Sequence, residues 1–232
     1  MDGEDDQYSP ESQDEAAGFD VLETEPASAE MWLQKGIALR KMGRYDEALE
    51  SIARAIDLDP SMADAWTNRS SAQNSLGRYH EALESALESI KIDPLRARTW
   101  IVKGFALHNL GRYEESVASY ARAIELDPQG ADSRRAWNNR GAALDNLKRH
   151  EEAIDSYEEA IMIDPFDSYA WNNKGVALSA LSRNEEALMC FRKAVEIDPQ
   201  YTTAWKNMSM SLKALGRDDE AREAAQMAEE LD

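Results

Sequence analysis

Apolar and small residues recur along residues 29–232 at the three- and four-residue spacing of a helix surface. They form pairs of segments, such as residues 66–76 and 81–92, and each pair opens at a tryptophan and closes before a proline. Segments of this spacing predict amphipathic helices, and the short link between two of them predicts a turn. We therefore expect an all-α chain built from helical hairpins.

Tryptophan and proline share one long-range period. Consecutive tryptophans lie 34 residues apart, except Trp100 and Trp137, which lie 37 apart. Six of the seven prolines repeat with the same intervals. The two series are Trp32, Trp66, Trp100, Trp137, Trp171 and Trp205, and Pro26, Pro60, Pro94, Pro128, Pro165 and Pro199. Their agreement indicates an internal repeat of 34 residues, with three residues inserted before the fourth copy.

Turn and stop signals divide each repeat. Glycine, which enters positive φ at little cost, marks the link between the two helices in four repeats. These glycines are Gly43, Gly77, Gly111 and Gly216, and Lys148 and Ser182 stand in the same place in the fourth and fifth repeats. An Asp-Pro pair such as Asp59-Pro60 follows the second helix, and proline disfavours helix geometry in the residue before it. Each repeat therefore predicts one hairpin that ends before the next begins.

Small residues occupy fixed positions in each repeat, counted from residue 29. The eighth position holds Gly36, Gly104, Gly141 and Gly175, with Ser70 and Ser209, and the twentieth and twenty-seventh positions hold alanine except at Ser116 and Ser89. With tryptophan at the fourth position, this pattern resembles the tetratricopeptide repeat. The resemblance implies an α-solenoid of six stacked helix-turn-helix hairpins forming a right-handed superhelix, in which the small residues let the helices approach closely.

The chain is expected to have two parts. Residues 1–28 are acidic and poor in large apolar groups, so we expect a disordered N-terminal tail, and residues 29–232 form the repeat domain. The repeat units are 29–62, 63–96, 97–130, 134–167, 168–201 and 202–232, with the insertion at 131–133. The tail also contains an apolar cluster, Phe19, Val21 and Leu22, which we expect to dock on a hydrophobic surface of this chain or of a partner.

Charge limits the choice of partner. The formal net charge is −19, and residues 1–28 contribute ten acidic residues with no Lys or Arg, which leaves −9 on the rest of the chain. A surface of this sign repels phosphate backbones and anionic headgroups. We therefore expect another protein as the partner, with no nucleic acid and no membrane.

The resemblance also implies a binding surface. In tetratricopeptide repeats the first helix of each hairpin lines a concave groove, and the second, fifth, sixth, ninth, twelfth and thirteenth positions face the ligand. The sixth positions hold Gln34, Asn68, Val102, Asn139, Asn173 and Asn207, which resembles an asparagine ladder that holds an extended peptide through its backbone amides. Arg98 and Arg135 at the second position are candidates for a ligand carboxylate, and Phe105, Val176 and Met210 lie at the ninth. The twelfth position adds Arg40, His108 and Lys213.

Simpler interpretations of these residues remain open. The asparagines can be ordinary polar residues on a solvated helix face, and the arginines can be unpaired surface cations. We also expect the acidic tail to occupy its own groove near Arg98 and Arg135, in which case its deletion would raise the affinity for a peptide.

The leading hypothesis for the function is a protein-protein interaction scaffold or adaptor that binds a peptide or helix of a partner in the groove. One alternative is a self-assembling structural repeat protein, a homo-oligomer formed through the uncapped C-terminal hairpin. A less favoured alternative is a co-chaperone that clamps the acidic tails of chaperones. Asn68 and Arg98 match that clamp, but Leu33, Ile37 and Val102 are apolar where the clamp has polar groups.

Sequence signals for catalysis are lacking, so we expect no enzyme, no cofactor and no metal site. The three histidines, His80, His108 and His150, lie in different hairpins without a Cys or second His at ligand spacing. Cys190 stands among apolar residues and is expected to be a core residue. The absence of a signal peptide, of a long apolar run and of a second cysteine favours a cytoplasmic location.

Overall fold

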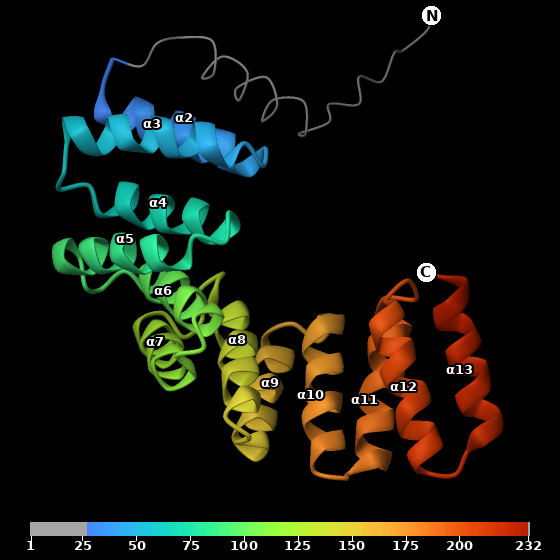
Figure 1. The fold of residues 1–232 in the computed structure, drawn as a ribbon. Helices are drawn as coiled ribbons and strands as arrows, with labels where there is room; N and C mark the ends of the chain where they lie inside the picture. The colour runs from blue at the N-terminus through green and yellow to red at the C-terminus, as the bar shows by residue number, and fades with distance from the viewer. Residues whose placement is uncertain (1–26, 232) are drawn as a thin grey trace, which may run out of the picture. The chain divides into compact units, whose positions relative to one another are not determined.

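A computed structural model describes residues 27–231, and every regular element in that range is an α-helix (Figure 1). The helices pack in consecutive pairs, which confirms the predicted all-α solenoid of helical hairpins. The chain divides after Pro94 into two compact units. Residues 1–26, which include Phe19, Val21, Leu22 and most of the expected tail, lie outside the described residues.

The first unit contains two hairpins. Its helices are α2 (Ala29–Lys41), α3 (Tyr45–Leu58), α4 (Ala63–Ser75) and α5 (Tyr79–Ile92). Helix α3 packs both on its partner α2 and on the following first helix α4. The apolar residues Ile52, Ala55 and Ile56 therefore join the two hairpins in one cluster with Ala65.

The second unit contains four hairpins. Its helices are α6 (Ala97–Asn109), α7 (Tyr113–Leu126), α8 (Ser133–Asn146), α9 (His150–Ile163), α10 (Ser168–Ala180), α11 (Asn184–Ile197), α12 (Thr202–Ala214) and α13 (Asp218–Glu230). Each second helix again packs on its own first helix, and α7, α9 and α11 also pack on the first helix of the next hairpin. One cluster extends from Leu144 to Ala224, so the last three hairpins of this unit share a continuous core.

All six hairpins turn through one residue in the left-handed region. Gly43 has φ 76°, and the backbone N–H of Arg44 donates to Leu39 O at 2.9 Å, which closes the end of α2. Lys148 and Ser182 adopt the same conformation with φ 62° and 61° although they carry side chains. The hairpin geometry therefore overrides the conformational preference of these two residues.

An arginine directly follows the turn residue and pairs with a glutamate three residues later. Arg183 donates from Nε and Nη2 to both carboxylate oxygens of Glu186, at 2.7 and 2.8 Å. The same bidentate pair occurs in four other hairpins, as Arg44–Glu47, Arg112–Glu115, Arg149–Glu152 and Arg217–Glu220. The hydrogen bond from the arginine lowers the pKa of each of these glutamates.

A hydrogen bond explains why tryptophan and proline share a period. The indole N–H of Trp66 donates to Pro60 O at 3.0 Å, and Trp171 and Trp205 make the same bond with Pro165 and Pro199. The tryptophan thereby ties the start of one hairpin to the end of the preceding one. A cationic residue three positions later lies over the ring, as Lys174 does over Trp171 at 5.8 Å.

Each glycine at the eighth position faces a large side chain of its partner helix. A Cβ at Gly141 would lie 2.5 Å from Cε1 of Tyr157, and one at Gly175 would lie 2.6 Å from Cε1 of Phe191. Where serine replaces this glycine, alanine stands sixteen residues later. These pairs are Ser70 with Ala86 and Ser209 with Ala225, and each serine donates to a partner-helix carbonyl, Ala82 O at 2.8 Å and Ala221 O at 2.7 Å. Helix spacing in a hairpin is thus set by one matched pair.

The second hairpin has an unusually polar interior. Gln73 replaces the leucine found at this position in the other five hairpins, and its Oε1 accepts from Ser85 Oγ at 2.7 Å. Thr67 and Ser89 are fully buried and share a hydrogen bond of 2.8 Å between their hydroxyls. Helices α4 and α5 are therefore held together by hydrogen bonds at a level where the other five hairpins have a leucine.

Candidate peptide-binding surface

The first helices of the second unit lie along one side of it. Helix α8 contacts α6 and α10, and α10 contacts α12. Among residues 95–231, the second helices α7, α9, α11 and α13 make no comparable contacts with one another. Helices that approach more closely on one side of a stack form the inner side of its curve. We call the exposed surface of α6, α8, α10 and α12 the first-helix face.

A chain of asparagine amides crosses three helices of this face. Asn207 Nδ2 on α12 donates to Asn172 Oδ1 on α10 at 2.9 Å, and Asn172 Nδ2 donates to Asn173 Oδ1 at 3.4 Å. Asn173 Nδ2 then donates to Asn138 Oδ1 on α8 at 3.2 Å. The amides are thereby held in fixed orientations between neighbouring hairpins.

The amide chain keeps hydrogen-bonding capacity for a ligand. An asparagine side chain has two N–H donors and an oxygen that accepts two hydrogen bonds. Asn173 uses one of each in the chain, and its side chain is half-buried rather than enclosed. Asn139, one residue after Asn138, is half-buried and lies near the buried Tyr120. Asn139, Asn173 and Asn207 can therefore each offer part of an amide to a peptide group.

An apolar pocket of about 250 Å³ adjoins the amide chain. Val176 on α10 and Met210 on α12 line it, together with Phe191 from α11 and the amide of Asn207. Val176 is 42% exposed and Met210 is 70% exposed, although both are apolar. The pocket has the size and lining to receive one apolar side chain next to a backbone held by the asparagines.

Positive charge is distributed along this face of an otherwise acidic protein. Arg98 on α6 and Lys213 on α12 are exposed, and within residues 27–231 neither has an ion pair. Arg135 on α8 is exposed and lies 3.6 Å from Asp132, a distance at which the pair is weakly bound. Phe105 on α6 is 41% exposed. Acidic groups of a ligand would therefore meet available cations on this face.

The two predicted site residues of the first unit have different surroundings. Gln34 is exposed, and its Nε2 donates to Glu30 Oε1 at 3.0 Å. Asn68 is only 6% exposed, and its Nδ2 donates to Asp64 O at 2.9 Å. Leu33, which stands at a clamp position, is buried in the core of the first hairpin. In this unit the amide of Asn68 is thus engaged within its own helix.

Sequence reasoning missed three residues of the first-helix face. Asn138 and Asn172 at the fifth position complete the amide chain, and Tyr169 on α10 is 60% exposed beside Tyr201, with 4.9 Å between the ring centroids. The asparagines had a signal, because the triplet Trp-Asn-Asn occurs at residues 137–139 and 171–173. Tyr169 stands at the second position of its repeat, where sequence reasoning considered only the arginines as candidates for ligand binding.

Reactive groups elsewhere in the second unit are held in structural contacts. Burial raises the pKa of Cys190 to about 11, so its thiol stays protonated at neutral pH. Asp145 accepts from Tyr157 Oη at 2.8 Å and lies 2.8 Å from His150 Nδ1. Burial is also the main reason that the pKa of Tyr157 is raised. This group ties the end of α8 to α9.

The part of the chain that the structure describes shows two further absences. No helix in it combines the length and the apolar character needed to cross a membrane. Nor do residues 27–231 contain a group of three His, Cys, Asp or Glu side chains placed to hold a metal ion.

Models of the tetratricopeptide repeat match four stretches of the sequence, residues 33–97, 97–129, 135–167 and 168–201. The chain belongs to the tetratricopeptide-repeat family. The predicted resemblance is confirmed, and the matched repeats include every helix that forms the first-helix face except α12. No curated protein matches the sequence of this tetratricopeptide-repeat protein.

Solved structures share its fold. PilF of Pseudomonas aeruginosa is 17% identical, with a TM-score of 0.75 and coverage of 91% of this chain and 90% of PilF. MamA of Desulfovibrio magneticus RS-1 is 24% identical, with a TM-score of 0.66 and coverage of 73% and 94%. YrrB, described as a tetratricopeptide-repeat protein with an unusual peptide-binding site, is 22% identical, with a TM-score of 0.62 and coverage of 81% and 95%. At these identities the similarity shows the fold of the present chain and leaves its ligand open.

Proposed function

We propose that this protein is an interaction scaffold that binds an extended segment of another polypeptide on the first-helix face of its second unit. The observation that carries the proposal is the amide chain from Asn207 to Asn138, because it orients several amides along the direction in which a peptide would run. Similarity to YrrB, whose description includes a peptide-binding site, supports the same kind of ligand.

The neighbouring groups define the chemistry of the ligand. The pocket between Val176 and Met210 accepts one apolar side chain. Arg98, Arg135 and Lys213 favour carboxylates elsewhere in the same segment. We propose a segment with an apolar anchor and acidic neighbours, bound through its backbone to Asn139, Asn173 and Asn207.

Affinity capture with mass spectrometry tests this function, with exposed methionines as a matched pair. Met210→Ser removes an apolar wall of the pocket, whereas Met162→Ser removes a methionine of similar exposure, 66% against 70%, from α9. Both side chains are mostly in solvent, so neither change should unfold the hairpins. Proteins retained by the native chain and by Met162→Ser but lost by Met210→Ser are the expected ligands.

A second variant tests the amides. Asn139→Ala, Asn173→Ala and Asn207→Ala together should lose the same proteins, because they remove the polar contacts to the ligand backbone. Far-UV circular dichroism must show that this variant keeps its helices, since Asn173 and Asn207 also link the hairpins. Retention of the same proteins by Met210→Ser and by the folded triple variant would refute binding at this face.

A further inference from the structure

Helix α2 exposes a face that is buried in other first helices of the chain. The third position of the repeat units that begin at residues 63, 134, 168 and 202 holds Ala65, Ala136, Ala170 and Ala204, and each is 0% exposed. Met31, at the same position of α2, is 46% exposed, and Met42, just beyond the end of the helix, is 48% exposed. Met31 thus exposes a large apolar side chain at a position that is buried in these four helices, and Met42 adds a second exposed methionine.

A preceding second helix covers this face in these four hairpins. Helix α3 packs on α4, α7 on α8, α9 on α10 and α11 on α12. At three of these junctions two consecutive residues of the second helix belong to the same hydrophobic cluster as the third-position alanine of the next first helix. The pairs are Ala55–Ile56 with Ala65, Ala123–Ile124 with Ala136, and Ala194–Val195 with Ala204. Within residues 27–94, α3 and α4 are the only helices that contact α2.

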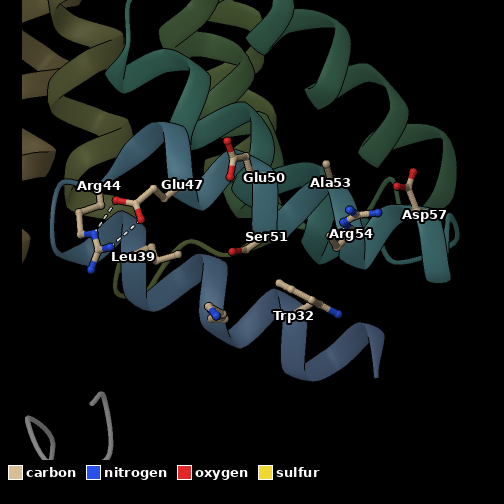
Figure 2. Close-up of a pocket in the computed structure, with 10 residues that line it drawn as sticks. Trp32, Leu39, Arg44, Glu47, Glu50, Ser51, Ala53, Arg54 and Asp57 are labelled. Atoms are coloured by element: carbon tan, nitrogen blue, oxygen red, sulfur yellow. Dashed lines mark hydrogen bonds and ion pairs between the residues drawn. The ribbon is translucent and has the colours of Figure 1, made fainter. Parts of the chain in front are cut away.

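A pocket of about 700 Å³ adjoins the exposed face, between α2 and α3. Figure 2 shows Trp32 and Leu39 projecting from α2 toward α3, with the Arg44–Glu47 pair at one end. The fifth hairpin has the equivalent pocket around Trp171, with a smaller volume of about 370 Å³.

The smaller pocket contains a side chain from the preceding helix. Glu158 of α9 lines it, and its Oε1 lies 2.7 Å from Lys174 Nζ. Lys35 is the equivalent of Lys174 in the first hairpin. All residues that line the pocket of the first hairpin come from α2 and α3 or the turn between them, so the place of Glu158 is not taken by a described residue.

The sequence before α2 has residues at the spacing that such a covering helix requires. Pro26 precedes Pro60 by one repeat period of 34 residues. Ala53, Ala55 and Ile56 stand seven, five and four residues before Pro60, and Phe19, Val21 and Leu22 stand at the same distances before Pro26. Glu158 likewise stands seven residues before Pro165. Phe19 therefore corresponds to the residue that enters the pocket, and Val21–Leu22 to the pair that covers the third position.

We propose that the segment of residues 19–22 covers the exposed face of α2 and so caps the first hairpin, with Phe19 in the pocket beside Trp32 and Lys35 and with Val21 and Leu22 on Met31. This cap would bury apolar groups of both partners and keep the end of the repeat array from contacting other molecules. It places the apolar cluster on α2, whereas the sequence alone suggested the surroundings of Arg98 and Arg135. The proposal does not depend on the function of the first-helix face.

Hydrogen-deuterium exchange of the full chain tests the cap. Phe19→Ala with Leu22→Ala removes its apolar contacts, and Tyr8→Ala removes an aromatic residue of the same tail outside the segment of residues 19–22. Burial of two large side chains changes the opening equilibrium by at least about tenfold, so the amides of α2 should exchange at least about tenfold faster in the double variant than in Tyr8→Ala. The amides of α12 should exchange at the native rate in both, which also shows that the variants are folded.

Addition of a synthetic peptide with the native sequence of residues 9–26 to the double variant should restore slow exchange in α2. Three results would overturn the cap. One is equal exchange of α2 in the double variant and in Tyr8→Ala. Another is faster exchange in α6 and α8 instead of α2, which would place the segment on the first-helix face. The third is faster exchange of α2 when the native chain is diluted, which would place the segment on a second copy.

Discussion

The eighth position holds either glycine facing a large side chain or serine facing alanine sixteen residues later. This pairing can be tested by converting a hairpin of the first kind to the second kind. In the fifth hairpin Gly175 faces Phe191, which is 1% exposed and cannot move aside into solvent. Gly175→Ser would place a Cβ 2.6 Å from Cε1 of that ring. Phe191→Ala removes the ring, and the double variant then has the residues of the second hairpin, where Ser70 is followed sixteen residues later by Ala86.

The magnitudes follow from packing. Overpacking by Gly175→Ser should cost about 1–3 kcal/mol, of which the better helix propensity of serine returns about 0.5 kcal/mol. Phe191→Ala leaves a cavity and should cost about 3–5 kcal/mol. In the double variant the clash is gone, and the new hydroxyl can donate to Ala187 O as Ser70 does to Ala82 O at 2.8 Å. We expect the double variant to be more stable than the sum of the single changes by about 2 kcal/mol.

Native-state amide exchange of α10 and α11 measures these free energies, because repeat arrays can unfold one part at a time and a single global midpoint can conceal the effect. Exchange in the first unit serves as the internal control. The reasoning would be refuted if Gly175→Ser left the exchange of α10 and α11 unchanged. It would equally be refuted if the effects of the two changes added within about 0.5 kcal/mol.

Four further predictions follow from other features of the hairpins. Lys148→Gly should raise stability by about 1 kcal/mol in urea denaturation, because φ is 62° there, whereas Lys148→Ala should give no gain. Gln73→Leu should raise the free energy of unfolding of the first unit by about 1 kcal/mol and so raise its urea midpoint, since Ser85 can then bond to Glu81 O as Ser119 does to Glu115 O. A lower midpoint would show that the polar interior is required. The glutamates paired with Arg44, Arg112, Arg149, Arg183 and Arg217 have a folded-state pKa below the ordinary 4.5, so their contribution is present above that pH and is lost as the pH falls through the lowered values. The thermal midpoint of the native chain should therefore fall as the pH falls through these pKa values. It should fall by less in a variant with all five glutamates changed to glutamine, and an equal fall would assign the pH dependence to other groups. Light scattering over a concentration series should give the monomer mass throughout, because Arg222, Glu223, Gln226, Glu229 and Glu230 are exposed on α13, and a mass that rises with concentration would favour self-assembly.

Residue spacing alone predicts the hairpins and the packing inside each of them. Trp66 and Pro60 are six residues apart and joined by a hydrogen bond, and Gly175 and Phe191 are sixteen apart and in contact, so a fixed spacing carries each relation. Local conformation did not depend entirely on residue type, since Lys148 has the same positive φ as the turn glycines.

Which of the repeated positions are available to a ligand depends on three-dimensional contacts that the spacing does not predict. Asn68 and Asn173 hold the same position in their units, yet Asn68 bonds within its own helix and Asn173 bonds to Asn138 of the preceding hairpin. Met31 is exposed where Ala65 is buried, although both are the third residue of a first helix. The physical reason is that burial depends on what the neighbouring hairpin contributes across the junction. The period of the sequence marks equivalent positions, but the contacts across each junction give them different surroundings.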